Sequence, residues 1–237
     1  MSRRKTLNER RLTRREVQEL IASGARQRPD LAAPLERTLS TGYKEQPLVY
    51  ELEGERFLFV FDPAEPGLGG KGDIYPADAF HRFVRWTAKV NEDYQHGRAS
   101  SVEHWAYYSA FKHDLIAALD TLIEQLRSAM ARTSDDLDLS YRSLDLVSEY
   151  VEGIGVERAQ QELYDQLVAY VGEVLKLRIQ GRWELNKSRP QPYPYVVAGR
   201  HGPVMPINVV WEQLSGLEPV NLRAAAANEV RRTRMPP

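Results

Sequence analysis

The sequence of 237 residues contains no cysteine. This absence excludes disulfide bridges, zinc sites built from thiolates, cysteine-ligated iron–sulfur clusters and a cysteine nucleophile. A chain of this length buries a sizeable core without such crosslinks, because the buried fraction of the surface rises with chain length. The absence of cysteine also agrees with a cytoplasmic location, which we expect for this protein.

Long apolar segments are missing as well. The longest uncharged apolar runs, such as residues 57–61, are far shorter than the roughly 20 residues that a transmembrane helix requires. The basic start of the chain resembles the first part of a signal peptide, but four charged residues interrupt the segment that follows, residues 12–21. We therefore expect no secretory signal and no membrane insertion.

The net charge is close to zero, at −1, but positive charge gathers at both ends of the chain. Residues 3–15 contain seven arginine or lysine residues against one acid, Glu9, and residues 217–237 form a basic tail. Basic ends can bind nucleic acid or anionic lipid. No aromatic residues are interleaved with them for stacking on bases, so we interpret both ends as solvated and keep nucleic-acid binding as an alternative.

The first half of the chain combines a β-hairpin with long helices. Apolar runs at residues 48–53 and 56–61, joined around Gly54, predict a hairpin over 48–61. Its second strand is apolar on both faces, so we expect other elements to cover each side. Two apolar stripes at helical spacing follow, and they predict an antiparallel helical pair over residues 77–131, with Pro76 at the first helical position. Residues 1–135 are thus an N-terminal helical region with a hairpin.

An acidic segment at residues 133–143 is the best candidate for a domain boundary. Beyond it, helical spacing over 156–180 ends before Gly181, which we place at the C′ position of the helix. Short strands at 182–185 and 195–198 and a helix at 206–214 are predicted next. Residues 136–216 therefore form a C-terminal module of a helix on a small sheet, and the fold class is helix-rich α+β.

The glycine-rich loop at residues 67–72 follows a strand and precedes a helix, as a phosphate-binding loop does. The candidate residues are Gly69, Gly70, Lys71 and Gly72, with the amides as a cradle and Lys71 as the charge. A P-loop places serine or threonine after its lysine, whereas Gly72 and Asp73 follow Lys71 here. We therefore favour a surface loop, and a nucleotide-binding protein or enzyme that uses this loop remains an alternative.

Neither a metal site nor a catalytic motif is specified. Asp136, Asp138 and Ser140 imitate the first ligands of a calcium loop, but Tyr141 and Val147 occupy the positions that require glycine and glutamate. The histidines form no HExxH pair, and no Gly-x-Ser-x-Gly sequence is present. We therefore expect no metal and no cofactor, and a protein without catalytic activity is the more plausible interpretation.

Aromatic residues and arginine gather in the last third of the chain. Such residues anchor protein interfaces. We interpret Trp183 and Trp211 as core residues, whereas Tyr193 and Tyr195 are flanked by prolines and predicted to be exposed. The predicted interaction surface consists of Arg182, Tyr193, Tyr195 and Arg200.

Three short motifs carry a resemblance to known proteins: residues 170–175 (Tyr-Val-Gly-Glu-Val-Leu), Gly181-Arg182-Trp183, and a proline-led helix after residues 203–206. Residues 144–216 resemble a module of uncharacterised bacterial proteins, some of the toxin-neutralising immunity type. The resemblance implies a bacterial origin and a binding role. The leading hypothesis is a non-catalytic protein-binding protein, such as an immunity protein or a component of a larger assembly, whose partner is another protein.

Overall fold

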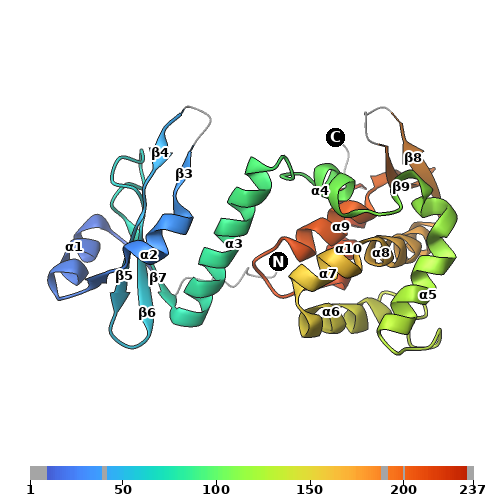
Figure 1. The fold of residues 1–237 in the computed structure, drawn as a ribbon, viewed down its shortest axis with the longest axis horizontal. Coiled ribbons are helices and arrows are strands. Elements are labelled where there is room, and N and C mark those ends of the chain that lie inside the picture. The colour runs from blue at the N-terminus through green and yellow to red at the C-terminus, as the bar shows by residue number, and fades with distance from the viewer. Residues whose placement is uncertain (1–9, 39–41, 188–191, 200, 234–237) are drawn as a thin grey trace. The chain divides into compact units, whose positions relative to one another are not determined.

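A computed structural model describes residues 10–38, 42–187, 192–199 and 201–233 (Figure 1). The chain divides into two compact units, Met1–Gln95 and His96–Pro237. The predicted α+β class is confirmed, because helices accompany a five-stranded antiparallel sheet in the first unit and a three-stranded sheet in the second. Within the described ranges, no helix is both long enough and apolar enough to cross a membrane.

The first unit is built on a sheet with the strand order β1-β7-β6-β5-β2. The predicted hairpin is its centre, where β5 and β6 pair from Leu48↔Val60 to Leu52↔Arg56. A short separate ribbon, β3–β4, pairs Arg37 with Glu45. In chain order the elements are β1 (Arg10–Leu12), α1 (Arg14–Ala22), β2 (Arg26–Gln27), α2 (Pro29–Ala32), the 3₁₀ helix η1 (Ala33–Leu35), β3 (Arg37–Thr38), β4 (Lys44–Glu45), β5 (Leu48–Leu52), β6 (Arg56–Val60), β7 (Gly72–Pro76) and α3 (Ala77–Gln95).

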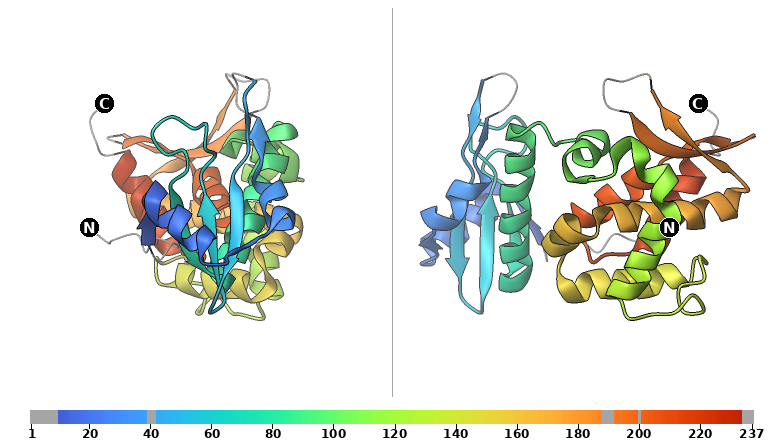
Figure 2. Two further views of the ribbon diagram at one scale, coloured as in Figure 1. Left: turned by 90° about the vertical axis from the view of Figure 1, so that its left-hand side faces the viewer. Right: turned by 45° about the vertical axis from the view of Figure 1, so that its right-hand side comes forward.

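Both faces of the central strand β6 are covered, as its apolar sequence predicts. Helix α1 lies on one face, where Val17 shares a core cluster with Leu58. Helix α3 lies on the other face, where Phe80 stacks on Phe57 with 4.9 Å between ring centroids. Figure 2 shows the two helices on opposite sides of this sheet. The expectation of cover on each side is therefore confirmed.

The predicted helical pair over residues 77–131 is wrong in its second member. Helix α3 ends at Gln95, and the segment after it forms three pieces: α4 (Ser101–Tyr108), the 3₁₀ helix η2 (Lys112–Ala118) and α5 (Leu119–Ala129). The chain leaves the helix because the buried carboxylate of Asp165 accepts the backbone N–H groups of Ala110, at 2.7 Å, and Phe111, at 3.2 Å. Pro76 also differs from its predicted role, since it ends β7 rather than opening the helix.

The two units meet at residues 95 and 96, whereas the sequence placed the boundary near residue 135. The acidic segment 133–143 lies inside the second unit. Leu137 in this segment is fully buried, and the N–H of Leu139 donates to the hydroxyl of Tyr170 at 3.3 Å. An acidic composition therefore marks a packed loop here and not a linker.

The second unit surrounds a nearly wholly buried helix, α8. Most of its residues are buried on every side of the axis, which is the pattern of a helix enclosed by its neighbours. The predicted helix over 156–180 is interrupted at Leu163, where the backbone leaves helical geometry at φ −128° and ψ 10°. The remaining elements are α6 (Ser143–Ile154), α7 (Val156–Glu162), α8 (Tyr164–Ile179), β8 (Arg182–Asn186), β9 (Tyr193–Ala198), β10 (His201–Val204), α9 (Pro206–Leu214) and α10 (Leu222–Arg232).

The basic tail predicted over residues 217–237 contains instead a core helix, α10. Asn221 caps it, because its side-chain oxygen accepts the N–H of Ala224 at 2.9 Å. Leu222, Ala226 and Val230 recur at helical spacing and are buried in the main core of the second unit. The arginines project from the opposite side of the helix, so composition alone gave the appearance of a solvated tail.

Helix α8 ends one residue before the predicted position. Gln180 adopts the left-handed conformation, at φ 52° and ψ 45°, and the N–H of Gly181 bonds to the carbonyl of Lys176 at 2.9 Å, as in a Schellman motif. Gly181 serves close packing instead, since a Cβ at this position would lie 2.6 Å from the carbonyl oxygen of Val197. This close approach holds the end of α8 against β9.

Candidate interaction site

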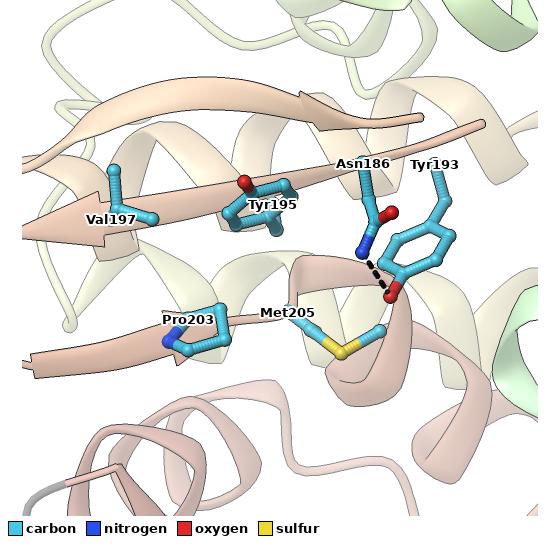
Figure 3. A pocket seen from close by; sticks show the side chains of 6 residues that line it. All are labelled: Asn186, Tyr193, Tyr195, Val197, Pro203 and Met205. Carbon is cyan, nitrogen blue, oxygen red and sulfur yellow. Dashed lines mark hydrogen bonds between the residues drawn. The ribbon is translucent and has the colours of Figure 1, made fainter. Parts of the chain in front are cut away.

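The outer face of the three-stranded sheet contains a hollow of about 270 Å³. Figure 3 shows the side chains of β9 on one side of this hollow and those of Pro203 and Met205 on the other. Tyrosine, proline and methionine make the lining largely apolar, and one amide adds a polar group. The lining residues are Asn186, Tyr193, Tyr195, Val197, Pro203 and Met205.

The alternation of the hairpin β8–β9 places these side chains on one face. Strands β8 and β9 pair as Arg182↔Val197, Glu184↔Tyr195 and Asn186↔Tyr193, and side chains directly opposite each other share a face. The intervening residues, among them Trp183 and the fully buried Val196, point to the other face and pack on the core around α8. One face is therefore committed to the core, and the other is left for contacts.

Hydrogen bonds hold the two tyrosines in place. The hydroxyl of Tyr195 donates to Oε2 of Glu184 at 2.9 Å, and Arg182 donates to Oε1 of the same carboxylate at 2.7 Å. The amide of Asn186 donates to the hydroxyl of Tyr193 at 2.8 Å. The hydrogen bond to Glu184 and its negative charge raise the pKa of Tyr195, so this phenol stays protonated at neutral pH. The aromatic rings are thus fixed before any ligand arrives.

The structure brings together three of the four predicted interaction residues. Tyr193 and Tyr195 line the hollow, and Arg182 lies on the same face, linked to Tyr195 through Glu184. Arg200 lies outside the described residues. Sequence reasoning missed five further residues of this face: Glu184, Asn186, Val197, Pro203 and Met205. Strand alternation gave a signal for the first three, whereas the last two depend on how β10 and α10 pack.

Helix α10 holds the wall of the hollow that Pro203 and Met205 form. The buried carboxylate of Glu229 accepts the backbone N–H of Met205 at 2.8 Å. Arg232 donates two hydrogen bonds to the same carboxylate, at 2.7 and 2.9 Å, and a longer one to the carbonyl of Pro203, at 3.4 Å. The C-terminal helix is therefore part of the site.

The residues that carry the resemblance to bacterial proteins form the support beneath this sheet. The indole N–H of Trp183 donates to Oε1 of Glu173 at 2.7 Å, and its ring lies directly over Gly172, where no Cβ stands in the way. Lys176 pairs with the other carboxylate oxygen of Glu173 at 2.5 Å. The hydroxyl of Tyr170 donates to Oγ of Ser143 at 2.6 Å. These motifs have an architectural explanation, since they fix the hairpin on α8.

The glycine-rich loop connects the antiparallel strands β6 and β7 and does not lead into a helix. Its amides are used within the loop: Gly69 bonds to the carbonyl of Glu65 at 2.9 Å, Gly70 to that of Phe61 at 3.1 Å and Lys71 to that of Leu68 at 2.9 Å. Gly72 belongs to β7. The amides of Gly69, Gly70 and Lys71 therefore do not form the anion cradle that a phosphate-binding loop needs.

The crowding around Gly69 leads to a testable contrast within this loop. A Cβ on Gly69 would lie 2.4 to 2.9 Å from the carbonyl oxygens of Pro63, Glu65 and Asp62. We expect Gly69→Ala to destabilise the first unit by about 2 kcal/mol, because the loop must shift to admit the methyl group. Lys71→Ala should change the melting temperature little, with or without added nucleotide. Thermal unfolding followed by circular dichroism measures both, and nucleotide stabilisation that Lys71→Ala removes would contradict this reading.

The described parts of the basic ends form contacts within their own units. Arg11 donates two hydrogen bonds of 2.8 Å to the buried carboxylate of Asp73. Arg14 donates to the carbonyl of Gly69 at 2.5 Å. Arg223 pairs with Asp145 at 2.9 Å. Several of the basic residues that suggested a nucleic-acid surface therefore stabilise the fold.

No group of three or more potential ligand side chains is arranged to hold a metal ion in the part of the chain that the structure describes. In the segment that imitated a calcium loop, Asp138 accepts the N–H of Ser140 at 3.0 Å and Asp136 accepts that of Thr133 at 3.1 Å. Those carboxylates shape turns. The hydrogen bonds from Ser140 and from the backbone of Thr133, respectively, contribute to lowering their pKa values.

The fold and the site together define a two-unit α+β protein whose C-terminal sheet presents a tyrosine-lined face. No protein-family model, no curated protein and no solved structure matches this chain.

Proposed function

We propose that this chain is a non-catalytic protein-binding protein that contacts its partner through the outer face of the sheet β8–β9–β10. The observation that carries the proposal is the hollow between Tyr193, Tyr195 and Met205, whose tyrosines are fixed by neighbouring side chains. Rigid tyrosines provide a large contact area at a small loss of conformational entropy when a partner binds.

The size of the hollow favours a side chain of a partner over a small-molecule substrate. Its volume is about 270 Å³, which is below the range of roughly 300–1,000 Å³ that small-molecule sites usually have. A hollow of this size admits one large side chain of another protein. The surrounding face, with Arg182 and Glu184, then supplies polar contacts at the rim of the interface.

The kind of partner is a finer part of this proposal. The resemblance of residues 144–216 to bacterial proteins, some of the immunity type, supports a toxin-neutralising protein or a component of a larger assembly in the cytoplasm. The residues behind that resemblance hold the proposed binding face in place, because Trp183 and Glu173 join the hairpin to α8. We therefore expect the partner to be a protein encoded near this one.

Alanine substitutions on the sheet test the proposal. We expect Tyr193→Ala and Tyr195→Ala each to weaken binding of the native partner by about 2 kcal/mol, which corresponds to roughly thirtyfold, because buried tyrosines dominate such interfaces. The partner is first recovered in stoichiometric amount from the native host, and its affinity for each variant is then measured by calorimetry.

The matched control is Tyr94→Ala, which removes a tyrosine that is 70% exposed on α3 of the first unit. This variant should bind the partner as the wild-type protein does. Equal affinity of all three variants would contradict the proposed face. Failure to recover a stoichiometric partner would count against a protein-binding function altogether.

A further inference from the structure

The outer edge of β8 presents backbone groups that no other strand in the described part of the chain pairs. Strand β8 stands at the end of the order β10-β9-β8, and its register places Leu185 opposite Pro194. Proline has no N–H, so these two residues cannot exchange the hydrogen bonds of a reciprocal pair. That role therefore falls to the flanking pairs, Glu184↔Tyr195 and Asn186↔Tyr193.

The same alternation directs the N–H and C=O groups of Trp183 and Leu185 away from β9, to the free side of the strand. A regular exposed edge of this kind is a template for another strand. The opposite edge of the sheet is protected, since β10 has an irregular register and contains Pro203, and the N–H of Gly202 bonds to the carbonyl of Thr233 at 3.4 Å. β8 has neither proline nor bulge along its five residues.

The charges on β8 indicate which strand fits this edge. Arg182 and Glu184 lie two residues apart on the outer face and carry opposite charges. We propose that β8 pairs in antiparallel fashion with β8 of a second copy of this chain, about a two-fold axis at Trp183. Arg182 then lies opposite the partner's Glu184, and Glu184 lies opposite the partner's Arg182.

The pairing rules select this register. Centred on Trp183, the two tryptophans form the hydrogen-bonded pair, and the charged residues form the flanking pairs in which side chains approach most closely, with about 4.5 Å between Cα atoms. A register centred on Glu184 satisfies the same hydrogen-bonding rule but places two carboxylates directly opposite each other, which is destabilising. Charge complementarity therefore separates the two.

The resulting dimer has a continuous six-stranded sheet. Because the two-fold axis is perpendicular to the sheet, both outer faces lie on the same side. The hollow is lined from β9, the end of β10 and Met205, so it stays open in each copy. Two hollows on one face can engage a repeated partner at once, which raises the overall affinity without a new contact. This inference goes beyond the proposed function and does not depend on it.

Sedimentation equilibrium of the full chain over a range of concentrations tests the dimer. One short strand pair is a small interface, so we expect a dissociation constant of about 10–100 μM. Arg182→Glu and Glu184→Arg should each weaken self-association at least about tenfold, because each places like charges opposite each other. An equimolar mixture of the two variants should associate as the wild-type protein does, since opposite charges face each other again in the mixed dimer.

The control is Arg158→Glu, which reverses a charge in the exposed pair Arg158–Glu162 on α7 and should leave self-association unchanged. Circular dichroism verifies that each variant is folded. Arg182 is 76% exposed, so its variant keeps the test decisive even if Glu184→Arg does not fold. A wild-type chain that stays monomeric at the highest concentration overturns the proposal. A dimer that Arg182→Glu does not weaken overturns it too, as does a variant mixture that associates no better than either variant alone.

Discussion

Alanine at position 172 is expected to lower the free energy of unfolding of the second unit by about 3 kcal/mol. Gly172 lies in the buried helix α8, and a Cβ there would stand 2.1 Å from Cζ2 and Cη2 of Trp183. Neither group can move without loss, because the tryptophan ring donates its N–H to Glu173 and α8 is packed on all sides. The hairpin β8–β9 must therefore lift from the helix, and the binding face moves with it.

Urea unfolding measures this effect. Tryptophan fluorescence reports chiefly on the second unit, because Trp105, Trp183 and Trp211 belong to it. The matched control is Gly153→Ala in α6, where a Cβ would meet nothing within 4 Å. Alanine is the better helix former, so this control should gain up to about 1 kcal/mol.

The double variant Gly172→Ala/Trp183→Leu separates the clash from other causes. If the tryptophan ring is the obstacle, the two substitutions together should cost less than the sum of the single ones, because residues in contact are not additive. Additive losses, or a Gly172→Ala variant as stable as the wild-type protein, would contradict the packing described for this site.

Glu229→Ala is expected to destabilise the second unit by about 2–3 kcal/mol. The carboxylate is only 6% exposed and accepts hydrogen bonds from the N–H of Met205 and from the guanidinium of Arg232. Its removal leaves a half-buried N–H without an acceptor and releases the end of α10. Since Arg232 is itself 56% exposed, water can solvate its charge, which limits the loss.

Glu229→Gln and Glu218→Ala complete this experiment. Glutamine keeps an oxygen for the N–H of Met205, so its loss should be smaller than that of alanine. Glu218 is exposed, and its replacement should change stability by no more than about 0.5 kcal/mol. Equal urea midpoints for all three variants would show that α10 does not contribute to the core, as the interpretation of residues 217–237 as a tail requires.

The hairpin of the first unit and the tyrosine face of the second were both accessible from short-range patterns. Apolar residues on both faces of residues 56–61 required cover on both sides, and α1 and α3 supply it. Tyr193 and Tyr195 stand two residues apart in a strand, so they share a face wherever that strand lies. These inferences hold because they depend on local backbone periodicity.

Other features depended on partners distant in sequence. The long helix predicted to reach Met130 breaks near Ala110 because Asp165, far along the chain, takes two of its N–H groups. No pattern near residue 110 signals this competition. The apparent tail became a helix of the core for a similar reason, since Leu222 and Ala226 are buried by elements that precede them by many residues.

The sequence by itself determined the α+β class, the central hairpin and the exposed position of Tyr193 and Tyr195, because secondary-structure periods and turn residues are read over a few neighbours. The tertiary structure alone decided the unit boundary, the role of Gly172 beneath Trp183 and the hollow that Met205 closes. Each of these depends on which distant groups come within a few ångströms of one another, and a steric contact or a shared carboxylate leaves no periodic signal along the chain.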